Sequence, residues 1–318
     1  MIDADLHASL EQLCKNGSIQ TDGSIGTESS LLAALTTLGI SYTESGHRLE
    51  LESPLTLINP QTVNSNLAGA GPLDEFEWQY RLFTESTNAD VLQLFESSRK
   101  PCIAIAEMQT GGRGRRGRQW LSPFAKNIIC TIGMHKSVAG CSPGLLSIVT
   151  GLALIEALEN AGVVGVQLKW PNDLYYQNKK LGGILIESKM IAKQEYFFAI
   201  GFGINVMMNA KEMFAIPQPV TSIDSITDNP VSRDRLLAES IRQVVTAVNE
   251  FDQASVPEII DCFLAKDAFK NQTICVDHAD EAIEGRNLGI NSDGQLKVET
   301  KQGIRVFSAA DISIKRVT

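Results

Sequence analysis

The chain has 318 residues, of which 43% are apolar and 20% charged, a composition typical of a folded protein with two or three compact units. No apolar run approaches the ~20 residues needed to cross a bilayer, the first residues lack a secretion signal, and a net charge of −9 argues against general nucleic-acid binding. The six cysteines form neither a CxxC pair nor a metal-ligand spacing with the four histidines. We therefore expect a cytoplasmic protein with no membrane association and no dedicated metal site.

Residues 1–66 are predicted to form a small acidic domain. They hold eight acidic side chains but only two basic ones, Lys15 and Arg48. The elements expected here are helices near 4–15 and 28–38 and a hairpin through 41–51. Gly46 would supply the turn of the hairpin. A stretch rich in Pro, Asn and Gly, 59–72, is interpreted as a linker that packs only in part, and the first domain boundary is placed within it.

Residues 67–267 are predicted to form an α/β domain, because short apolar runs alternate with helical periodicity. The expected strands are 102–107, 128–133, 163–170, 183–187 and 196–200. The expected helices run from Ser142, with Pro143 in the first turn, to Gly162, from Ser232 to about Phe251, and near 257–267.

Residues 268–318 are predicted to form a small β-barrel, because short strand patterns follow one another closely. The expected strands are 273–276, 281–290, 295–300, 304–308 and 311–315.

Residues 111–120, Gly-Gly-Arg-Gly-Arg-Arg-Gly-Arg-Gln-Trp, form the most distinctive motif and are called the arginine loop below. Like charges this close cost free energy unless an anion compensates them, and glycines let the backbone approach a ligand. Arginine binds phosphate or carboxylate through two parallel hydrogen bonds. The motif therefore predicts a mobile loop that wraps a small anion. An arginine-rich RNA-binding turn or a plain basic surface loop is the alternative, which the lack of basic surface elsewhere disfavours.

Two lysines stand in the next motifs, Lys-Trp-Pro-Asn-Asp at 169–173 and Lys-Leu-Gly-Gly-Ile-Leu-Ile-Glu at 180–187. Because Pro, Asn and Asp favour a turn, we expect Lys169 and Lys180 to lie on two strands of one hairpin. Either lysine alone would more simply point to solvent. Glycines inside the second strand instead indicate the close approach of a ligand or another backbone.

Two smaller motifs carry polar side chains, Thr-Glu-Ser-Thr-Asn at 84–88 and Gly-Phe-Gly-Ile-Asn at 201–205. The first is typical of a helix start, whose free N–H groups face whatever lies in front of it. Taken alone, capping is the simpler role for Ser86 or Thr87, and Asn205 is an ordinary turn residue.

Together these segments resemble the biotin protein ligases. That family carries a Ser-Thr-Asn, the Gly-Arg-Gly-Arg-Arg-Gly-Arg loop followed by an aromatic residue, Lys-Trp-Pro-Asn-Asp, a Lys-Leu-x-Gly-Ile-Leu strand and a Gly-x-Gly-Ile-Asn, in the order found here. The resemblance extends from about residue 80 to the end of the chain. It implies an α+β or α/β fold, in which a catalytic domain with a mixed sheet, similar to class II aminoacyl-tRNA synthetases, precedes an SH3-like barrel.

The activity implied by the resemblance has two steps. Biotin and ATP form biotinyl-5′-adenylate and pyrophosphate, and a lysine of the biotin carboxyl carrier protein of acetyl-CoA carboxylase then takes the biotin. Neither step needs an enzyme nucleophile, in agreement with the lack of a Ser-His-Asp or Cys-His pattern. Mg²⁺ is expected to arrive on the ATP phosphates, because no carboxylate cluster predicts a cage for it.

The resemblance also assigns roles to residues. Lys180 and Arg115 are the expected catalytic residues, and the arginine loop is expected to order over the adenylate. The expected biotin contacts are Ser86, Thr87, Asn88, Gln109, Gly112, Arg113, Gly114, Arg115, Lys180 and Gly183. The expected ATP and adenylate contacts are Arg113, Arg115, Arg116, Trp120, Lys169 and Asn205.

Some members of the family carry an N-terminal winged helix-turn-helix and repress biotin synthesis genes. Residues 35–51 resemble the later part of such a domain, but no lysine or arginine lies between Lys15 and Arg48 to neutralise phosphates. We interpret residues 1–66 as a degenerate winged-helix-like domain, which argues against DNA binding. A bifunctional ligase and repressor is the first alternative, and a lipoate or octanoyl transferase of related fold is the second. A homodimer through an exposed sheet edge is left open.

Overall fold

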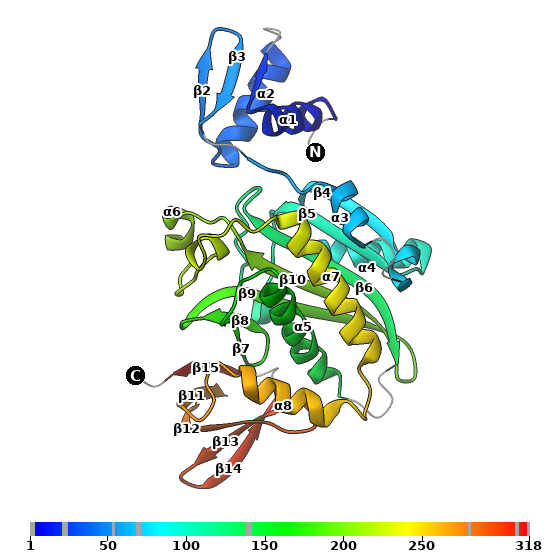
Figure 1. Cartoon of the computed structure of the whole chain (residues 1–318), viewed down its shortest axis with the longest axis vertical. Helices are drawn as coiled ribbons and strands as arrows, with labels where there is room; N and C mark the ends of the chain where they lie inside the picture. Colours follow the sequence, from blue (N-terminus) through cyan, green and yellow to red (C-terminus); the bar gives the residue numbers. More distant parts are fainter. Residues whose placement is uncertain are drawn as a thin grey trace.

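The computed structural model describes residues 4–20, 25–52, 55–67, 71–137, 142–278, 281–308 and 312–316. Three sheets follow one another along the long axis of the molecule (Figure 1). A three-stranded sheet lies at the N-terminal end, a seven-stranded sheet in the centre and a five-stranded sheet at the C-terminal end.

The N-terminal unit contains two helices and a small antiparallel sheet of strand order β1-β3-β2. Its elements are α1 (Ala4–Asn16), β1 (Ser18–Gln20), α2 (Ile25–Thr37), β2 (Tyr42–Ser45) and β3 (Arg48–Leu51). The predicted helices and hairpin are confirmed, with Gly46 at a φ of +60° in the turn, whereas β1 was not predicted. Leucines of this unit, among them Leu10 and Leu35, form one buried cluster with Leu82 and Phe124 of the central unit. The two units therefore share apolar contacts.

The stretch interpreted as a linker contains helix α3 (Pro60–Leu67), followed by the 3-10 turn η1 (Gly71–Glu75). Helix α3 packs against the central unit, because Val63 and Leu67 are buried there. The N–H of Asn59 donates to Asp234 at 3.1 Å. The expected partial packing is confirmed for this helix.

The central sheet is mixed, as predicted, with strand order β4-β5-β6-β10-β9-β8-β7. Strands β4 and β5 pair in parallel and the other neighbours pair antiparallel. The strands are β4 (Glu77–Thr84), β5 (Cys102–Gln109), β6 (Asn127–Ser137), β7 (Gln167–Lys169), β8 (Asp173–Tyr176), β9 (Lys179–Ala192) and β10 (Glu195–Asn205).

Strand β8 corrects one expectation about the two lysines. Lys169 ends β7 and Lys180 lies near the start of β9, but β8 runs between these strands and pairs with both. The lysines are therefore not on two strands of one hairpin. The Pro-Asn turn that the sequence predicts closes the β7–β8 hairpin instead.

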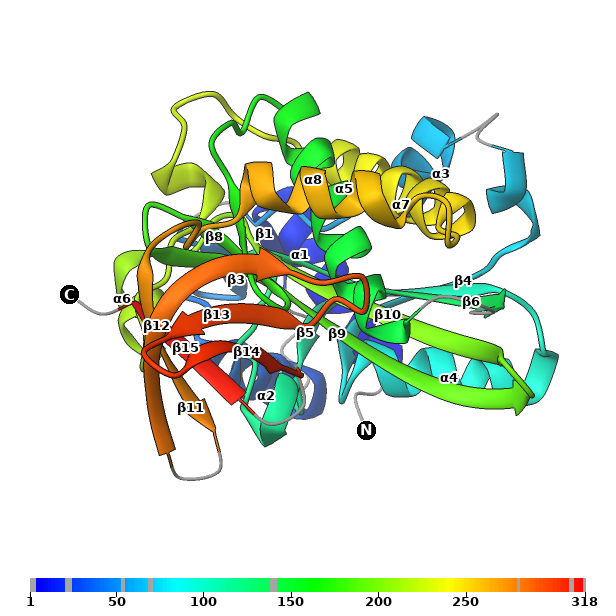
Figure 2. The same ribbon diagram turned by 90° about the horizontal axis from the view of Figure 1, so that it is seen from below.

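Helices cover the two faces of the central sheet (Figure 2). Helices α5 (Leu146–Asn160), α7 (Arg233–Glu250) and α8 (Val256–Lys266) lie on one side, and α4 (Thr87–Ser98) lies on the other. Alternate residues of β6, such as Ile128, Cys130 and Ile132, pack in the core that includes α5 and α7. The predicted helices are confirmed; the Ser232 side chain caps α7, and the Ser142 side chain caps the 3-10 turn η3 (Pro143–Leu145) that leads into α5. No helix among the described residues is long and apolar enough to span a bilayer.

The C-terminal unit is an antiparallel sheet of strand order β14-β13-β12-β11-β15. Its strands, β11 (Thr273–His278), β12 (Glu281–Ile290), β13 (Leu296–Thr300), β14 (Gly303–Phe307) and β15 (Ile312–Arg316), confirm the predicted series. Strands β14 and β15 occupy opposite edges and do not pair within the described part of this unit, so the expected closed barrel is not found there. A register shift between Asn287 and Ile290 interrupts the pairing of β12 with β13.

Candidate functional site

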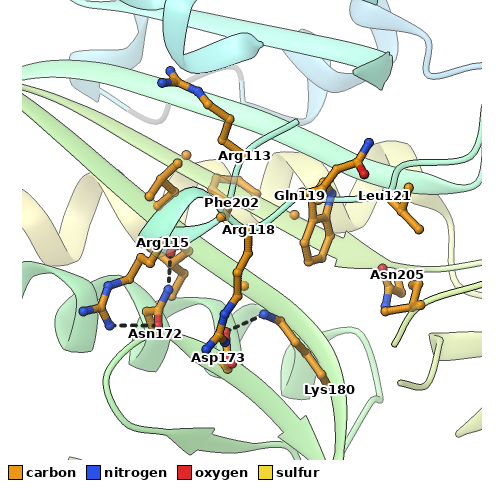
Figure 3. Close-up of a pocket in the computed structure, with 18 of the residues that line it drawn as sticks. Arg113, Arg115, Arg118, Gln119, Leu121, Asn172, Asp173, Lys180, Phe202 and Asn205 are labelled. Atoms are coloured by element: carbon orange, nitrogen blue, oxygen red, sulfur yellow. Dashed lines mark hydrogen bonds and ion pairs between the residues drawn. The ribbon is translucent and has the colours of Figure 1, made fainter. Parts of the chain in front are cut away.

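A cavity of about 590 Å³ opens on the central sheet. It is lined by the N-terminus of α4, the arginine loop, the β7–β8 turn, strands β9 and β10, and a segment at 215–220. Figure 3 shows Arg115 pointing toward Asn172 and Arg118 toward Asp173, and it shows Lys180 joined to Asp173. The predicted site residues that line the cavity are Ser86, Thr87, Asn88, Gln109, Arg113, Gly114, Arg115, Arg116, Trp120, Lys169, Lys180, Gly183 and Asn205.

Gly112 is the exception among the predicted residues, because it is not part of the lining. Its carbonyl accepts a hydrogen bond from the N–H of Trp120 at 2.8 Å. A Cβ at this position would lie 2.6 Å from the carbonyl oxygen of Trp120. Glycine is therefore needed here so that the two ends of the loop can meet.

One wall of the cavity carries the neutral polar side chains of Ser86, Thr87, Asn88 and Gln109. We call these residues the polar wall, together with the fully buried Thr131 behind them, which bonds to Thr87 and Asn88. Gln109 Oε1 accepts from the Thr87 N–H at 2.8 Å and from the Thr87 hydroxyl at 3.1 Å. Ser86 occupies the N-cap position of α4, as expected, but its side chain makes no capping bond within the described residues. The free N–H at the start of α4 is satisfied by Gln109 instead.

Asn88 is the most closely held member of the polar wall. Its Nδ2 donates to Glu187 at 2.8 Å and to the Leu185 carbonyl at 3.2 Å. Its Oδ1 accepts at 2.7 Å from the hydroxyl of Thr131, a buried β6 residue that belongs to none of the sequence motifs. A Cβ at Gly201 would collide with this Oδ1. The first glycine of the 201–205 motif thus makes room for Asn88.

The opposite wall carries charges; we call Arg115, Arg118, Asp173 and Lys180 the charged wall. Lys180 Nζ forms an ion pair with Asp173 at 2.7 Å, and both side chains are mostly buried, at 15% and 17% exposed. Nζ also lies 5.7 Å from the centre of the Trp120 ring. This lysine is therefore held in the cavity and does not extend into solvent, which was the simpler expectation for it alone.

The arginine loop is folded over the cavity as a short hairpin. Arg113 and Gln119 form an antiparallel bridge, and the Gly114 N–H donates to the Arg118 carbonyl at 2.6 Å. Arg115 donates to Asn172 of the β7–β8 turn at 3.4 Å (Figure 3). Burial lowers the pKa of the Arg115 guanidinium, as do two neighbouring arginines, while Asp173 opposes that shift.

Arg113 is placed differently from the other loop arginines. Its guanidinium lies 3.3 Å from Glu187 and points away from Lys180 (Figure 3). Arg118, which the sequence analysis did not select, instead points toward Asp173. Membership of the same loop was the signal that could have identified Arg118.

Lys169 is held by aromatic residues at the edge of the cavity. Its Nζ donates to the Tyr175 hydroxyl at 3.1 Å and lies 4.8 Å from the centre of that ring. Burial raises the pKa of Tyr175. The neighbouring Trp170 donates from Nε1 to the Gly294 carbonyl at 2.8 Å, which connects the turn between β12 and β13 of the C-terminal unit to the cavity wall.

Two buried polar atoms at the cavity have no hydrogen-bond partner in the described parts of the chain, Asn205 Oδ1 and Trp120 Nε1. The other side of the Asn205 amide is fixed, because Nδ2 donates to the Thr221 carbonyl at 3.1 Å. Unpaired buried polar groups are rare in folded proteins. Since both residues line the cavity, these atoms are available to a polar ligand.

Several lining residues were missed by sequence reasoning. Asn172 and Asp173 stood in a quoted motif but were given no role, although their side chains hold Arg115 and Lys180. Segment 215–220 has no recognisable motif. It reaches the cavity because the Lys180 N–H donates to the Pro219 carbonyl at 3.0 Å.

Metal-binding groups are not evident at this site. Among the residues that the structure describes, no group of three or more His, Cys, Asp or Glu side chains could hold a metal ion. The described cysteines are free, and Cys141 lies outside the described residues.

Comparison with known proteins gives consistent matches. Residues 80–205 match the model of the Biotin/lipoate A/B protein ligase family. The chain is 30% identical to the bifunctional ligase/repressor BirA of Escherichia coli over 86% of its own length and 83% of that protein. It is 29% identical to the biotin–[acetyl-CoA-carboxylase] ligase of Paracoccus denitrificans over 72% of its own length and 97% of that protein. Biotin protein ligase from Aquifex aeolicus, solved with biotin and ATP, has the same fold, with a TM-score of 0.62 and 24% identity over 76% of this chain and 99% of that one.

Proposed function

The chain belongs to the biotin protein ligase family, and we propose that it activates biotin with ATP and attaches it to a lysine of a carrier protein. The observation that carries this proposal is the convergence of separate segments on one cavity. The arginine loop, the β7–β8 turn and Lys180 bring charge to one side, and the polar wall brings neutral hydrogen-bonding groups to the other.

In the first step, a carboxylate oxygen of biotin attacks the α-phosphorus of ATP, forming biotinyl-5′-adenylate while pyrophosphate leaves. Two anions must meet, so the step requires fixed positive charge at the new bond. Lys180 and Arg115 are the proposed catalytic residues. In support, Lys180 is mostly buried and held by Asp173, and Arg115 is fixed by Asn172.

We propose that the polar wall binds the neutral ring system of biotin. A urea group requires paired donors and acceptors, and Thr87, Asn88 and Gln109 supply both from buried or half-buried positions. Ser86, Gly114 and Gly183 complete the proposed biotin site because they line the same cavity. Gly112 contributes through the closure of the loop.

The adenylate is proposed to occupy the end of the cavity near Trp120 and Asn205. Their unpaired Nε1 and Oδ1 atoms could donate to and accept from a purine and its sugar. Arg116 and Lys169 line the cavity nearby and are proposed to contact phosphate groups. Arg113, also proposed at first for the anions, is directed to Glu187 and is considered further below.

Mg²⁺ is proposed to enter on the phosphate oxygens of ATP, where it would offset their charge. Among the described residues that line the cavity, Asp173 is the one carboxylate, and Lys180 already pairs with it. This donor set fits a metal held mainly by its nucleotide.

In the second step, the carrier lysine amine attacks the acyl carbon of the adenylate, an amide forms and AMP leaves. We propose the biotin carboxyl carrier protein of acetyl-CoA carboxylase as the acceptor, because the Paracoccus relative is named a biotin–[acetyl-CoA-carboxylase] ligase. The reaction is proposed to take place in the cytoplasm. The closed arginine loop would exclude water, which hydrolyses a mixed anhydride.

We propose that the N-terminal unit is a degenerate winged-helix-like domain that supports the catalytic unit. Its leucine core is continuous with Phe124, which follows the arginine loop closely in sequence. The described strands β2 and β3 and helix α2 carry a single basic residue, Arg48, too few for a duplex. A gel-shift assay with the upstream region of biotin synthesis genes, biotin and ATP should show no complex; a specific shift would favour the bifunctional alternative suggested by the Escherichia coli relative.

Two further features remain proposals. The C-terminal sheet is proposed to be SH3-like, in line with its five short antiparallel strands. A homodimer is proposed through an edge of the central sheet, and sedimentation at several concentrations would test it.

The decisive experiment is a labelling reaction. The protein, biotin, ATP, Mg²⁺ and a biotin carboxyl carrier domain are incubated, and biotin on the carrier is detected by mass spectrometry. We expect a single modified lysine, dependent on ATP. Transfer with lipoate or octanoate in place of biotin would instead support the transferase alternative.

A further inference from the structure

Glu187 lies on β9 between the polar wall and the arginine loop, and no role has been assigned to it so far. Its Oε2 accepts from Asn88 Nδ2 at 2.8 Å. Arg113 lies 3.3 Å from its Oε1 and 3.4 Å from its Oε2. One carboxylate therefore receives a donor from each of the two structures that line the cavity.

The carboxylate of Glu187 is more firmly placed than that of an ordinary surface ion pair. Asn88 is only 4% exposed, and the hydroxyl of Thr131, which is fully buried, fixes the other end of its amide. The Thr131 hydroxyl, which donates its proton to Asn88, lies 2.8 Å from the Thr87 hydroxyl and can accept from it, and the Thr87 N–H donates to Gln109 at 2.8 Å. A continuous chain of hydrogen bonds thus runs from the proposed biotin contacts to Glu187.

Besides the backbone bond from Gly111 to the Glu85 carbonyl at its base, the arginine loop bonds to the rest of the described protein through two side chains. Arg113 reaches Glu187 on one side, and Arg115 reaches Asn172 on the other. Between them, the loop is closed by its own backbone bonds. Among the described residues, the backbone hydrogen bonds of residues 113–118 stay within the hairpin, so loss of either side-chain attachment would free one side of the loop.

We propose that Glu187 is a positioning residue that anchors the arginine loop over the cavity through Arg113 and ties this anchor to Asn88 in the polar wall. The proposal rests on the proposed function for its consequence, which is retention of the activated biotin. The anchor itself is a property of the protein without ligand and can be measured separately.

The first test measures the anchor alone, by the rate at which trypsin cleaves the loop arginines in the ligand-free protein. Glu187→Gln keeps an oxygen that accepts from Asn88 but removes the charge that holds Arg113. We expect cleavage to become about threefold faster. In this regime the cleavage rate is proportional to the fraction of molecules whose loop is open, and loss of a half-exposed ion pair raises that fraction by about this factor. Glu96→Gln is the matched control. It removes an exposed ion pair of 2.8 Å between Glu96 on α4 and Lys189, which lies on the same strand as Glu187.

The second test measures retention of biotinyl-adenylate formed from biotin and ATP. Glu187→Gln should form it at the wild-type rate and release it about threefold faster. Added salt should speed release from the wild type and from Glu96→Gln, but much less from Glu187→Gln, since its ion pair is already absent. Glu187→Ala also removes the acceptor of a buried amide and should in addition raise the KM for biotin about tenfold.

The outcomes separate the two proposals. If no variant and no wild-type protein forms the adenylate, the proposed function fails, and the trypsin result still decides the anchor. Equal cleavage of Glu187→Gln and the wild type would overturn the anchor. Normal cleavage together with a raised biotin KM in Glu187→Gln would show that Glu187 acts only on the polar wall, and would also overturn it.

Discussion

The polar wall and the charged wall of the cavity are built by different rules. Thr87 and Asn88 of the polar wall are 3% and 4% exposed and bond to partners inside the protein, all of them neutral except the Glu187 carboxylate that accepts from Asn88. On the charged wall, Lys180 pairs with Asp173 and Arg115 bonds to Asn172. An anion that enters the cavity can replace these partners or bind the same cations beside them. The polar wall is fixed before any ligand binds, whereas the charged wall keeps its cations in the cavity, where they can bind an anion.

This difference suggests a division of work. A preorganised neutral wall can select a neutral ring system, because its donors and acceptors cannot move to suit a different ligand. A wall of held cations stabilises charge that develops only during the reaction. Substitutions in the two walls should therefore affect binding and chemistry to different extents.

The sharpest test of the comparison is Lys180→Ala on the charged wall. Removing one preorganised cation should slow adenylate formation by about a hundredfold to a thousandfold, by analogy with the loss of one stabilising donor. Transfer from supplied biotinyl-adenylate should change by only a few fold, because the new phosphate bond already exists. Single-turnover pyrophosphate release and carrier labelling measure the two steps. The neighbouring exposed Lys179→Ala is the control, and equal loss in both steps would contradict the role of Lys180.

Arg115→Gly is expected to have the next largest effect. It removes the half-buried contact with Asn172 and one charge over the cavity. Loss of a charge-assisted bond of about 1.5–3 kcal/mol should release the adenylate roughly ten to a hundred times faster. Freed adenylate should then label exposed lysines of an added unrelated protein, detected by streptavidin blot. Arg286→Gly, on β12 and outside the cavity lining, should not do so; adenylate retention equal to wild type in Arg115→Gly would exclude a lid function.

Asn88→Ala tests the polar wall. It removes the donor to Glu187 and the acceptor for the Thr131 hydroxyl. Leaving buried groups unpaired should cost about 1–3 kcal/mol, seen as an approximately tenfold or greater rise in the KM for biotin. The maximal rate of adenylate formation should fall far less than in Lys180→Ala. Ser97→Ala at the far end of α4 is the control; a larger loss of rate than of biotin affinity would remove the distinction between the walls.

The sequence predicted the elements that have a clear apolar period. Leu237, Ile241 and Val244 follow a helical spacing, and all three are buried on α7 as expected. Strand β8 was missed because it has only four residues and begins within turn-forming Asn and Asp. The motifs therefore located the cavity but not its full strand order.

The internal partners of the site were less predictable. Asp173 lies next to Lys180 because β8 pairs with β9. Glu187 bonds to Asn88 although almost a hundred residues of sequence separate them. Neither contact leaves a local pattern, since each depends on tertiary register. The direction of Arg113 also depends on tertiary structure. Composition predicts a cationic loop, but the position of Glu187 determines where the Arg113 guanidinium points.

The smallest expected effect concerns the support behind the charged wall. Trp170 lies beside Asn172 and the start of β8, and its Nε1 donates at 2.8 Å to the carbonyl of Gly294 in the turn between β12 and β13. Trp170→Phe removes that bond and should lower the free energy of unfolding by about 1 kcal/mol. Because the β7–β8 turn is then less well fixed, adenylate formation should slow by a few fold, with the KM for biotin unchanged. Urea unfolding and single-turnover rates measure both, with Trp78→Phe on β4, outside the cavity lining, as control. A raised KM for biotin with a normal rate would place the effect on the polar wall instead, and the C-terminal sheet would then support binding and not chemistry.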